Sequence, residues 1–173
     1  MSSNTNNEGN IREEMVRKDV VEVMVSLPAQ LFLNTGIPVC LWFLTNDKTQ
    51  RGRDRRGETL FIDARQMGTM KTRVERELTD KDISKISDIV HSWRNDQDYE
   101  DIAGFCYNAK YKEIEKNSFV LTPGRYVGAP EEEDDGEPFD EKMKRLTSLL
   151  KEQQEQGREL DRKINQSISR LIT

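Results

Sequence analysis

Histidine and cysteine are scarce in this sequence, and their scarcity limits the chemistry that the chain can perform. Its 173 residues include one histidine, His91, and two cysteines, Cys40 and Cys106. A catalytic triad built on histidine is not supported, because the spacing around His91 predicts the polar, solvent-facing side of a helix. Three such residues also cannot supply the four ligands of a structural zinc site. The sequence therefore predicts no metal site and no catalytic residue of these types.

Long apolar runs are also missing. The longest, at residues 37–44, is far shorter than the ~20 residues that span a bilayer. The first ten residues, MSSNTNNEGN, lack the cationic and apolar regions of a signal peptide. Hydrophobic and charged residues each make up 34% of the chain, and the mean hydropathy is -0.83. We expect a soluble, cytoplasmic protein whose cysteines stay reduced as small hydrophobic residues.

An overall positive charge is absent too, since the formal net charge is -5. Contact with nucleic acid must therefore come from a local basic patch. The glycines that stand among arginines, Gly52 and Gly57, lack the strand-to-helix setting of a phosphate-cradling loop. Composition alone thus identifies neither an active site nor a nucleotide site.

The hydrophobic patterns that are present indicate an α/β fold. Apolar and β-branched runs predict strands at residues 20–27, 38–45 and 59–65, the second buried on both faces. A short helical turn is expected at 11–19 after an exposed loop, and an amphipathic helix at 79–94 with Thr79 as its N-cap. Residues 104–128 mix alternation with turn residues and predict a hairpin or an extended excursion.

The composition changes near residue 129 and suggests two domains. Residues 1–128 hold the strands, residues 129–138 are an acidic linker, and residues 139–173 form a helical tail. Apolar residues of the tail recur every three or four positions, as in a coiled-coil seam. Gln153 and Gly157 fall on that seam, so either the helix breaks there or the seam is interrupted. The strand region resembles the last portion of an α/β domain, and a sheet cut in this way leaves an edge and apolar faces uncovered.

Three features are candidates for function, each with a structural alternative. The loop LPAQLFLNTGI places Phe32 where strands end, and its ring could stack on a flat ligand or pack the edge of the core. Residues 48–56 are rich in arginine and form what we call the basic loop. The basic loop could contact phosphates or form a solvated hairpin tip; its cations are Lys48, Arg51, Arg53, Arg55 and Arg56. The tail could dock on a partner helix or pack onto the body of the protein; its candidate contacts are Leu146, Leu150, Leu160, Ile164 and Ile168.

Four separated stretches, in the same order, resemble one family. The run IREEMVRKDVVEVMVSLPAQLFLNTGIPVCLWFLTNDK closely resembles the modification (M) subunit of type I restriction–modification enzymes, which are adenine-specific DNA methyltransferases. RRGETLFIDARQMG, LTDKDISKISDIVHSWR and FVLTPGRYVG continue the resemblance. It extends from Asn6 to Gly128 and, more loosely, over the tail.

The resemblance implies a fold and a set of roles. The strands would be the carboxy-terminal strands of a Rossmann-like methyltransferase sheet that uses S-adenosylmethionine, followed by a helical extension. The target adenine of such enzymes is flipped out of the duplex, which would make Phe32 a wall of its pocket with Asn34, Thr35 and Gly36 in support. The tail would bind the specificity subunit, and the full system would add a restriction subunit and double-stranded DNA.

The departures from the family pattern matter as much as the resemblance. The family's methyl-donor loop and its Asn-Pro-Pro-aromatic motif are both missing, since no proline here follows Asn or Pro. We therefore expect this chain alone neither to bind S-adenosylmethionine nor to methylate DNA. Two alternatives stay open: a non-enzymatic, truncated subunit that binds the specificity subunit or DNA, and one half of a split methyltransferase.

Overall fold

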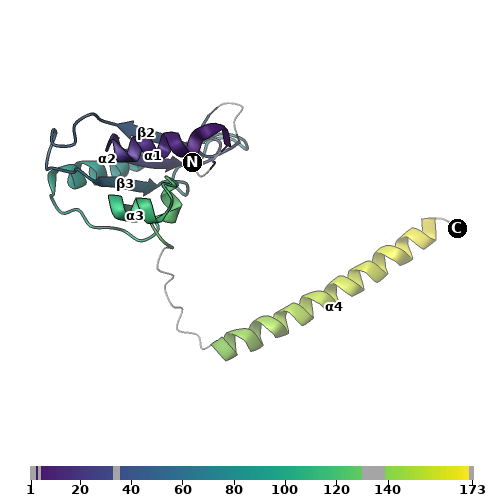
Figure 1. Cartoon of the computed structure of the whole chain (residues 1–173). Coiled ribbons are helices and arrows are strands. Elements are labelled where there is room, and N and C mark those ends of the chain that lie inside the picture. Colours follow the sequence, from purple (N-terminus) through teal and green to yellow (C-terminus); the bar gives the residue numbers. More distant parts are fainter. Residues whose placement is uncertain (1–2, 4, 33–35, 130–138, 172–173) are drawn as a thin grey trace. The chain divides into compact units, whose positions relative to one another are not determined.

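The computed structural model describes residues 3, 5–32, 36–129 and 139–171 (Figure 1). The chain divides into two compact units, Met1–Glu131 and Glu132–Thr173. The first unit contains η1 (Thr5–Asn7), α1 (Glu8–Arg17), β1 (Val21–Leu27), β2 (Val39–Leu44), β3 (Glu58–Asp63), β4 (Thr69–Met70), β5 (Arg76–Glu77), α2 (Asp80–Asn95), β6 (Cys106–Lys110), α3 (Tyr111–Lys116) and η2 (Pro123–Arg125). The second unit contains helix α4 (Phe139–Leu171).

A mixed four-stranded sheet with the order β2-β1-β3-β6 organises the first unit. β1 and β3 run parallel, with Val25 opposite Ile62, while β2 and β6 are antiparallel to their neighbours. β4 and β5 form a separate two-stranded hairpin. The predicted α/β class is confirmed.

Helices cover both faces of the sheet, as alternation along the strands requires. On one face Met24 and Phe61 pack with Val16 of α1 and Ile114 of α3. On the other face Val23 and Val25 of β1 and Leu60 and Ile62 of β3 pack against Trp93 of α2, which is fully buried. The central strands are therefore covered on both sides, which explains their β-branched and apolar sequences.

Local sequence signals for α2 and β1 are confirmed. Thr79 caps α2 by accepting a hydrogen bond from the backbone N–H of Asp82, whose carboxylate accepts from the N–H of Thr79 in return. This reciprocal pair satisfies two donors that would otherwise lack partners at the helix start. β1 is buried along its whole length.

Some expectations are wrong. β2 is not buried on both faces: it lies at the edge of the sheet, and Leu41, Phe43 and Leu44 are 41%, 45% and 53% exposed. Residues 104–128 form strand β6 and helix α3 rather than a hairpin. The α3 helix has six residues, too few for a helical period to stand out. Residues 8–10 belong to α1 and not to a loop.

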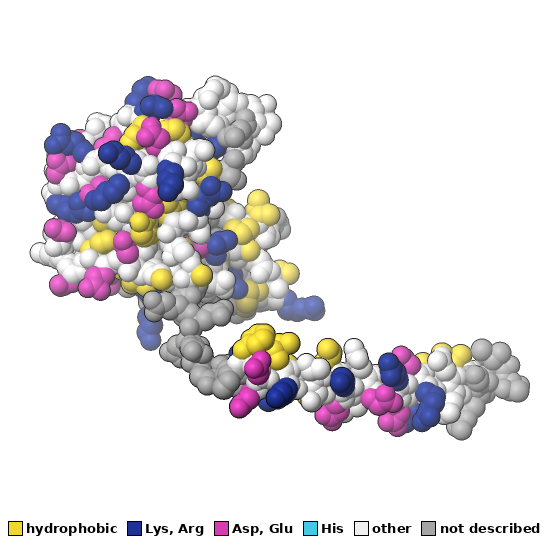
Figure 2. Space-filling model, turned by 60° about the horizontal axis from the view of Figure 1, so that its bottom comes forward, with side chains coloured by type: hydrophobic (Ala, Val, Ile, Leu, Met, Phe, Trp, Pro, Cys, Tyr) yellow, Lys and Arg dark blue, Asp and Glu magenta, His cyan; other side chains and the backbone are white. Residues whose placement is uncertain are grey.

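Helix α4 is continuous through Gln153 and Gly157. The helix does not break there, so these two residues interrupt the apolar seam instead. Figure 2 shows hydrophobic side chains along one side of α4, between charged ones. None of the described helices has the length and apolarity needed to cross a membrane.

Candidate functional site

The segment after β1 brings Phe32 to the end of the sheet at which the parallel strands β1 and β3 finish. Ser26 of β1 pairs with Asp63 of β3, so both strands finish at this end. The carbonyl of Gln30 accepts a 2.9 Å hydrogen bond from the backbone N–H of Arg76, which ties the segment to β5. Ligand crevices of open α/β sheets form beyond the carboxyl ends of the parallel strands.

Phe32 is available to a ligand at this position, because its side chain is 51% exposed. The preceding Leu31 packs against the core on the α2 side of the sheet, so Leu31 is the residue of this loop that packs at the edge of the core. Gly36 is exposed. Asn34 and Thr35, predicted to support the pocket, lie outside the described residues.

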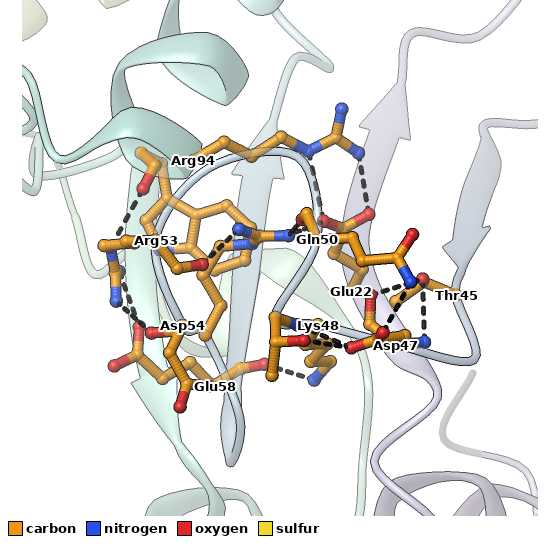
Figure 3. Close-up of polar contacts among 12 residues, drawn as sticks. Glu22, Thr45, Asp47, Lys48, Gln50, Arg53, Asp54, Glu58 and Arg94 are labelled. Carbon is orange, nitrogen blue, oxygen red and sulfur yellow. Dashed lines mark hydrogen bonds and ion pairs between the residues drawn. The ribbon is translucent and has the colours of Figure 1, made fainter.

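The basic loop lies at the opposite end of β1, where acidic residues surround it (Figure 3). Glu22 is 5% exposed and accepts hydrogen bonds from two arginines. Arg55 Nη2 lies 3.1 Å from its Oε1, and Arg94 donates through Nε at 3.1 Å and Nη2 at 2.7 Å. One carboxylate thus joins β1, the basic loop and α2.

A tryptophan fixes the loop from the side of α2. The guanidinium carbons of Arg53 and Arg55 each lie 5.6 Å from the centre of the Trp93 ring. Cations over an indole face are attracted by its quadrupole. Arg53 also donates through Nε to the backbone carbonyl of Trp93 at 3.1 Å. Gly52 is required beside it: its φ is 126°, and an added Cβ would lie 2.1 Å from the carbonyl oxygen of Arg94.

Lys48 points into the protein as well. Its Nζ donates to Asp19 Oδ1 at 2.6 Å and to the backbone carbonyl of Glu58 at 2.5 Å. Burial lowers the pKa of Lys48, and the hydrogen bond and charge of Asp19 oppose that shift. Asp19 accepts from the backbone N–H of Gly57 too, so it holds both ends of the loop.

The five cations predicted to contact phosphate therefore occupy different environments. Lys48 and Arg55 are 3% and 1% exposed and bind internal acids. Arg53 is 24% exposed at its side chain and pairs with Glu58 at 2.6 Å. Arg51 and Arg56 are exposed, and Arg56 pairs with Asp54, whose pKa it lowers to about 2. The set of cations open to a phosphate reduces to Arg51 and Arg56.

Glu58 makes the loop sensitive to acid. Burial raises the pKa of Glu58, but hydrogen bonds from Arg53, Lys110 and Asn108 outweigh it and lower the pKa to about 2, from an ordinary 4.5. A carboxyl with a depressed pKa stabilises the fold above its unfolded pKa, and this contribution is lost as the pH falls toward its folded pKa. We expect stability to fall between about pH 5 and pH 2, and Glu58→Gln to flatten that dependence. Urea denaturation at several pH values measures it, with Glu14→Gln, whose side chain is 62% exposed, as the control.

Sequence reasoning missed the partners of this loop, Glu22 and Arg94. Glu22 is the only acid in the β-branched run VVEVMV. A lone carboxylate inside a buried strand requires a cationic partner, and this signal could have pointed to an internal ion pair. Local composition does not reveal it, because 33 residues separate Glu22 from Arg55 and 72 separate it from Arg94.

A second feature that was missed is an apolar groove beside β2. Its volume is about 390 Å³, and side chains of β1, β2 and α2 line it. We refer to it as the β2–α2 groove. His91, predicted to be solvent-facing, is exposed and lies among its lining residues with Ser87 and Arg94.

The seam residues of α4 are exposed within the second unit. Each of the five predicted partner contacts is between 43% and 59% exposed: Leu146, Leu150, Leu160, Ile164 and Ile168. Among the described residues, no three His, Cys, Asp or Glu side chains are grouped so as to hold a metal ion.

Comparison with known proteins identifies the family. The family whose model matches residues 1–135 is described as "N-6 DNA Methylase". The chain belongs to the N-6 DNA methylase family. The resemblance seen in the sequence is thereby confirmed.

Two curated relatives of this N-6 DNA methylase chain are type I methylase subunits. The HindI methylase subunit of Haemophilus influenzae is 55% identical over 99% of the chain. The MjaIX methylase subunit of Methanocaldococcus jannaschii is 37% identical over 96% of the chain. The chain spans 38% and 29% of the lengths of these two relatives.

A solved structure supports the methyltransferase fold. It is the methyltransferase subunit of a type I restriction-modification system from Streptococcus thermophilus, with 31% identity and a TM-score of 0.59. The similarity covers 72% of this chain and 24% of that one.

The N-6 DNA methylase family implies S-adenosylmethionine as the methyl donor of the intact enzyme, and the described cavities do not fit it. The β2–α2 groove is lined mainly by apolar side chains. The cavity at the basic loop is lined by Arg51, Arg55 and Arg94, which disfavour a sulfonium cation, and both oxygens of its Glu22 already bind arginines.

Proposed function

We propose that this chain forms part of a type I modification methylase that methylates adenine in DNA in the cytoplasm, and that it is inactive alone. The observation behind the proposal is its 55% identity to the HindI methylase subunit along 99% of its length, although it spans 38% of that relative. The missing Asn-Pro-Pro-aromatic motif supports inactivity of the chain by itself. In the assembly, residues 1–128 complete the catalytic domain, and residues 139–173 bind the specificity subunit, alongside the restriction subunit.

A chimera tests this proposal. In the HindI methylase subunit, the segment aligned with this chain is replaced by residues 1–173, and the product is purified with the HindI specificity subunit. We expect transfer of labelled methyl groups from S-adenosylmethionine to adenine in DNA by the chimera and none by the chain alone. A folded chimera that does not methylate, or methylation by the chain alone, would contradict the proposal.

Within this proposal Phe32 stacks on the flipped adenine. Stacking on an aromatic ring contributes about 1–3 kcal/mol per base, so Phe32→Ala in the chimera should lower kcat/KM by about 5- to 150-fold. A 2-aminopurine at the target position should lose part of its flipping fluorescence. Val74→Ala, also at an exposed side chain, is the control and should leave both signals unchanged. An unchanged rate for Phe32→Ala would remove Phe32 from the pocket.

Arg51 and Arg56 are the proposed phosphate contacts. Each arginine that neutralises a phosphate steepens the salt dependence of DNA binding by about one unit of the logarithmic slope. We expect Arg51→Ala and Arg56→Ala each to weaken DNA binding by the chimera and to reduce that slope by about 1. Arg17→Ala, an exposed arginine on α1, is the control. If the slope does not change, the loop serves only as an internal brace.

A second candidate function is non-enzymatic binding of the specificity subunit. The exposed seam of α4 favours it, since a helix face of that kind fits a partner helix. It predicts that the chain binds the specificity subunit even where the chimera fails to methylate. The split-enzyme alternative predicts instead that methylation appears when the chain is mixed with a separate polypeptide that supplies the remaining motifs.

A further inference from the structure

We propose that Arg65 and Arg125 contact the phosphates on either side of the target adenine when the protein is bound to double-stranded DNA. We call the two residues the strand-end arginines, because they lie beyond the carboxyl end of β3. This inference rests on the proposed function and deepens it. It names residues that hold the target strand while Phe32 stacks on the flipped base.

The basic loop is too far from Phe32 to hold these two phosphates. The loop lies at the other end of β1, which has seven residues. A strand rises about 3.3 Å per residue, so the two ends of β1 are about 20 Å apart. Each strand of a duplex carries one phosphate per about 3.4 Å of its axis, so this separation corresponds to about six nucleotides. Contacts to the phosphates of the flipped nucleotide must therefore come from the Phe32 end of the sheet.

Backbone hydrogen bonds and packing place Arg65 at that end. The backbone N–H of Ala64 donates to the carbonyl of Ser26 at 2.8 Å, so the chain after β3 stays beside the end of β1. Leu31, next to the proposed stacking residue, and Met67 both pack against the core cluster on the α2 side of the sheet. The segment after β1 and the segment that carries Arg65 therefore lie together.

Arg65 is fixed by Asp63 and still faces solvent. Its Nε donates to Oδ1 and Oδ2 of Asp63 at 2.8 Å and 3.0 Å, and its Nη2 donates to Oδ2 at 2.6 Å. The side chain of Asp63 is 9% exposed, whereas that of Arg65 is 50% exposed. Within the part of the chain that the structure describes, no hydrogen bond uses Nη1 of Arg65. A guanidinium fixed in this way loses little freedom when its remaining donors bind a phosphate.

Gly124 brings a second arginine to this ion pair. A Cβ added to Gly124 would lie 2.6 Å from Nη2 of Arg65 and 3.1 Å from Oδ2 of Asp63, so η2 rests directly on the pair. Tyr126 holds η2 there, because its ring stacks on the phenylalanine of β3 with 3.9 Å between the ring centroids. Arg125 follows Gly124 directly and is exposed. Among the described residues, its side chain has no hydrogen-bond or ion-pair partner.

The two arginines contribute differently to a phosphate contact. Asp63 balances the charge of Arg65, so Arg65 supplies directed hydrogen bonds from a fixed planar group. Arg125 has no such acid and supplies net positive charge, which makes binding depend on salt. Phosphate contacts fix the position of a protein on a duplex and carry no sequence information. The strand-end arginines therefore suit holding the target strand in place.

Neutral phosphates test the contact. The chimera, purified with the HindI specificity subunit, is titrated by fluorescence anisotropy with two duplexes. They differ only in that the second has methylphosphonates at the two phosphates that flank the target adenine. The unmodified chimera should bind the neutral duplex at least about 10-fold more weakly, because charged hydrogen bonds are lost.

Variants of the strand-end arginines should abolish this difference. Arg65→Gln and Arg125→Gln should each bind the natural duplex more weakly and reduce the ratio of the two affinities to about threefold. The variant with both substitutions should bind the two duplexes equally. A double variant that keeps the full ratio, or an unmodified chimera that binds both duplexes equally, would overturn the proposal.

Control variants locate the contact. Arg17→Gln, at an exposed arginine of α1, should bind both duplexes as the unmodified chimera does. Arg51→Gln should weaken binding to both duplexes equally and keep their ratio, because the basic loop is at the far end of β1. Loss of the ratio in Arg51→Gln would assign the flanking phosphates to the basic loop and overturn the proposal.

Folding of the variants is verified by circular dichroism. Arg65→Gln leaves Asp63 without its ion-pair partner. Arg125→Gln breaks no hydrogen bond or ion pair among the described side chains. If Arg65→Gln does not fold, Arg125→Gln decides the test, and an unchanged ratio in that variant would overturn the proposal.

The outcomes separate this inference from the proposed function, because binding is measured without methylation. A chimera that binds DNA but does not methylate contradicts the proposed function. Loss of the ratio in the arginine variants of that chimera would still support the phosphate contacts. A methylating chimera whose arginine variants keep the full ratio overturns the contacts and leaves the proposed function intact.

Discussion

Replacing Glu22 by glutamine is expected to lower the free energy of unfolding by about 3–5 kcal/mol, the usual effect of removing one partner from a buried ion pair. The side chains of Glu22 and Arg55 are 6% and 1% exposed, so water cannot replace the lost carboxylate. Arg94 loses two charged hydrogen bonds as well. Urea denaturation of the full chain, followed by circular dichroism, measures the change.

Two controls identify the cause. Glu13→Gln breaks the 2.7 Å pair with Arg17 on the exposed side of α1, and the expected loss is below about 0.5 kcal/mol. The triple variant Glu22→Leu, Arg55→Met, Arg94→Met removes all three charges, and buried ion groups replaced by apolar residues of similar size are often neutral in stability. Recovery in the triple variant would attribute the loss to unpaired charge. A loss as large as in Glu22→Gln would attribute it to packing instead.

The cluster of Glu22, Arg55 and Arg94 shows why the sequence alone could not predict which arginines are buried. The arginines of the basic loop were interpreted from local composition, which correctly indicated a turn rich in cations. Whether a given arginine faces water depends on Glu22 and Trp93, which the fold brings from β1 and α2. Burial of Arg55 is therefore a tertiary property, and Lys48 with Asp19 repeats it across 29 residues.

Elements with a strong local code were predictable. Thr79, as an N-cap, predicted the start of α2, and the β-branched run at residues 20–27 predicted β1. The apolar run at residues 38–45 predicted that β2 is a strand, but it did not predict how far β2 is buried. The sequence of a strand indicates how many of its faces suit burial, whereas its actual burial depends on the elements packed around it.

Helix α4 provides the prediction with the largest expected effect on assembly. The double variant Leu160→Lys, Ile164→Lys should weaken binding to the specificity subunit at least about 100-fold. Burying each of these side chains contributes about 1.5–3 kcal/mol, and each 1.4 kcal/mol corresponds to a tenfold change in affinity. The two are 59% and 55% exposed in the second unit, so the substitutions should leave the helix intact, as circular dichroism can verify. Calorimetric titration with the specificity subunit measures the affinity.

A charge-matched control separates the seam from general electrostatics. Glu155→Gln with Glu159→Gln also raises the charge by two at the same spacing of four residues, but on the side of α4 away from the seam. This control should change the affinity for the specificity subunit by less than about threefold, which is the range expected from exposed charge pairs. Since Gln153 and Gly157 interrupt the seam, Leu146→Lys with Leu150→Lys should weaken binding separately, because each apolar half packs on its own. If the Leu160 and Ile164 variant binds as tightly as the control, the seam does not contact the specificity subunit, and α4 must use its polar side or another partner.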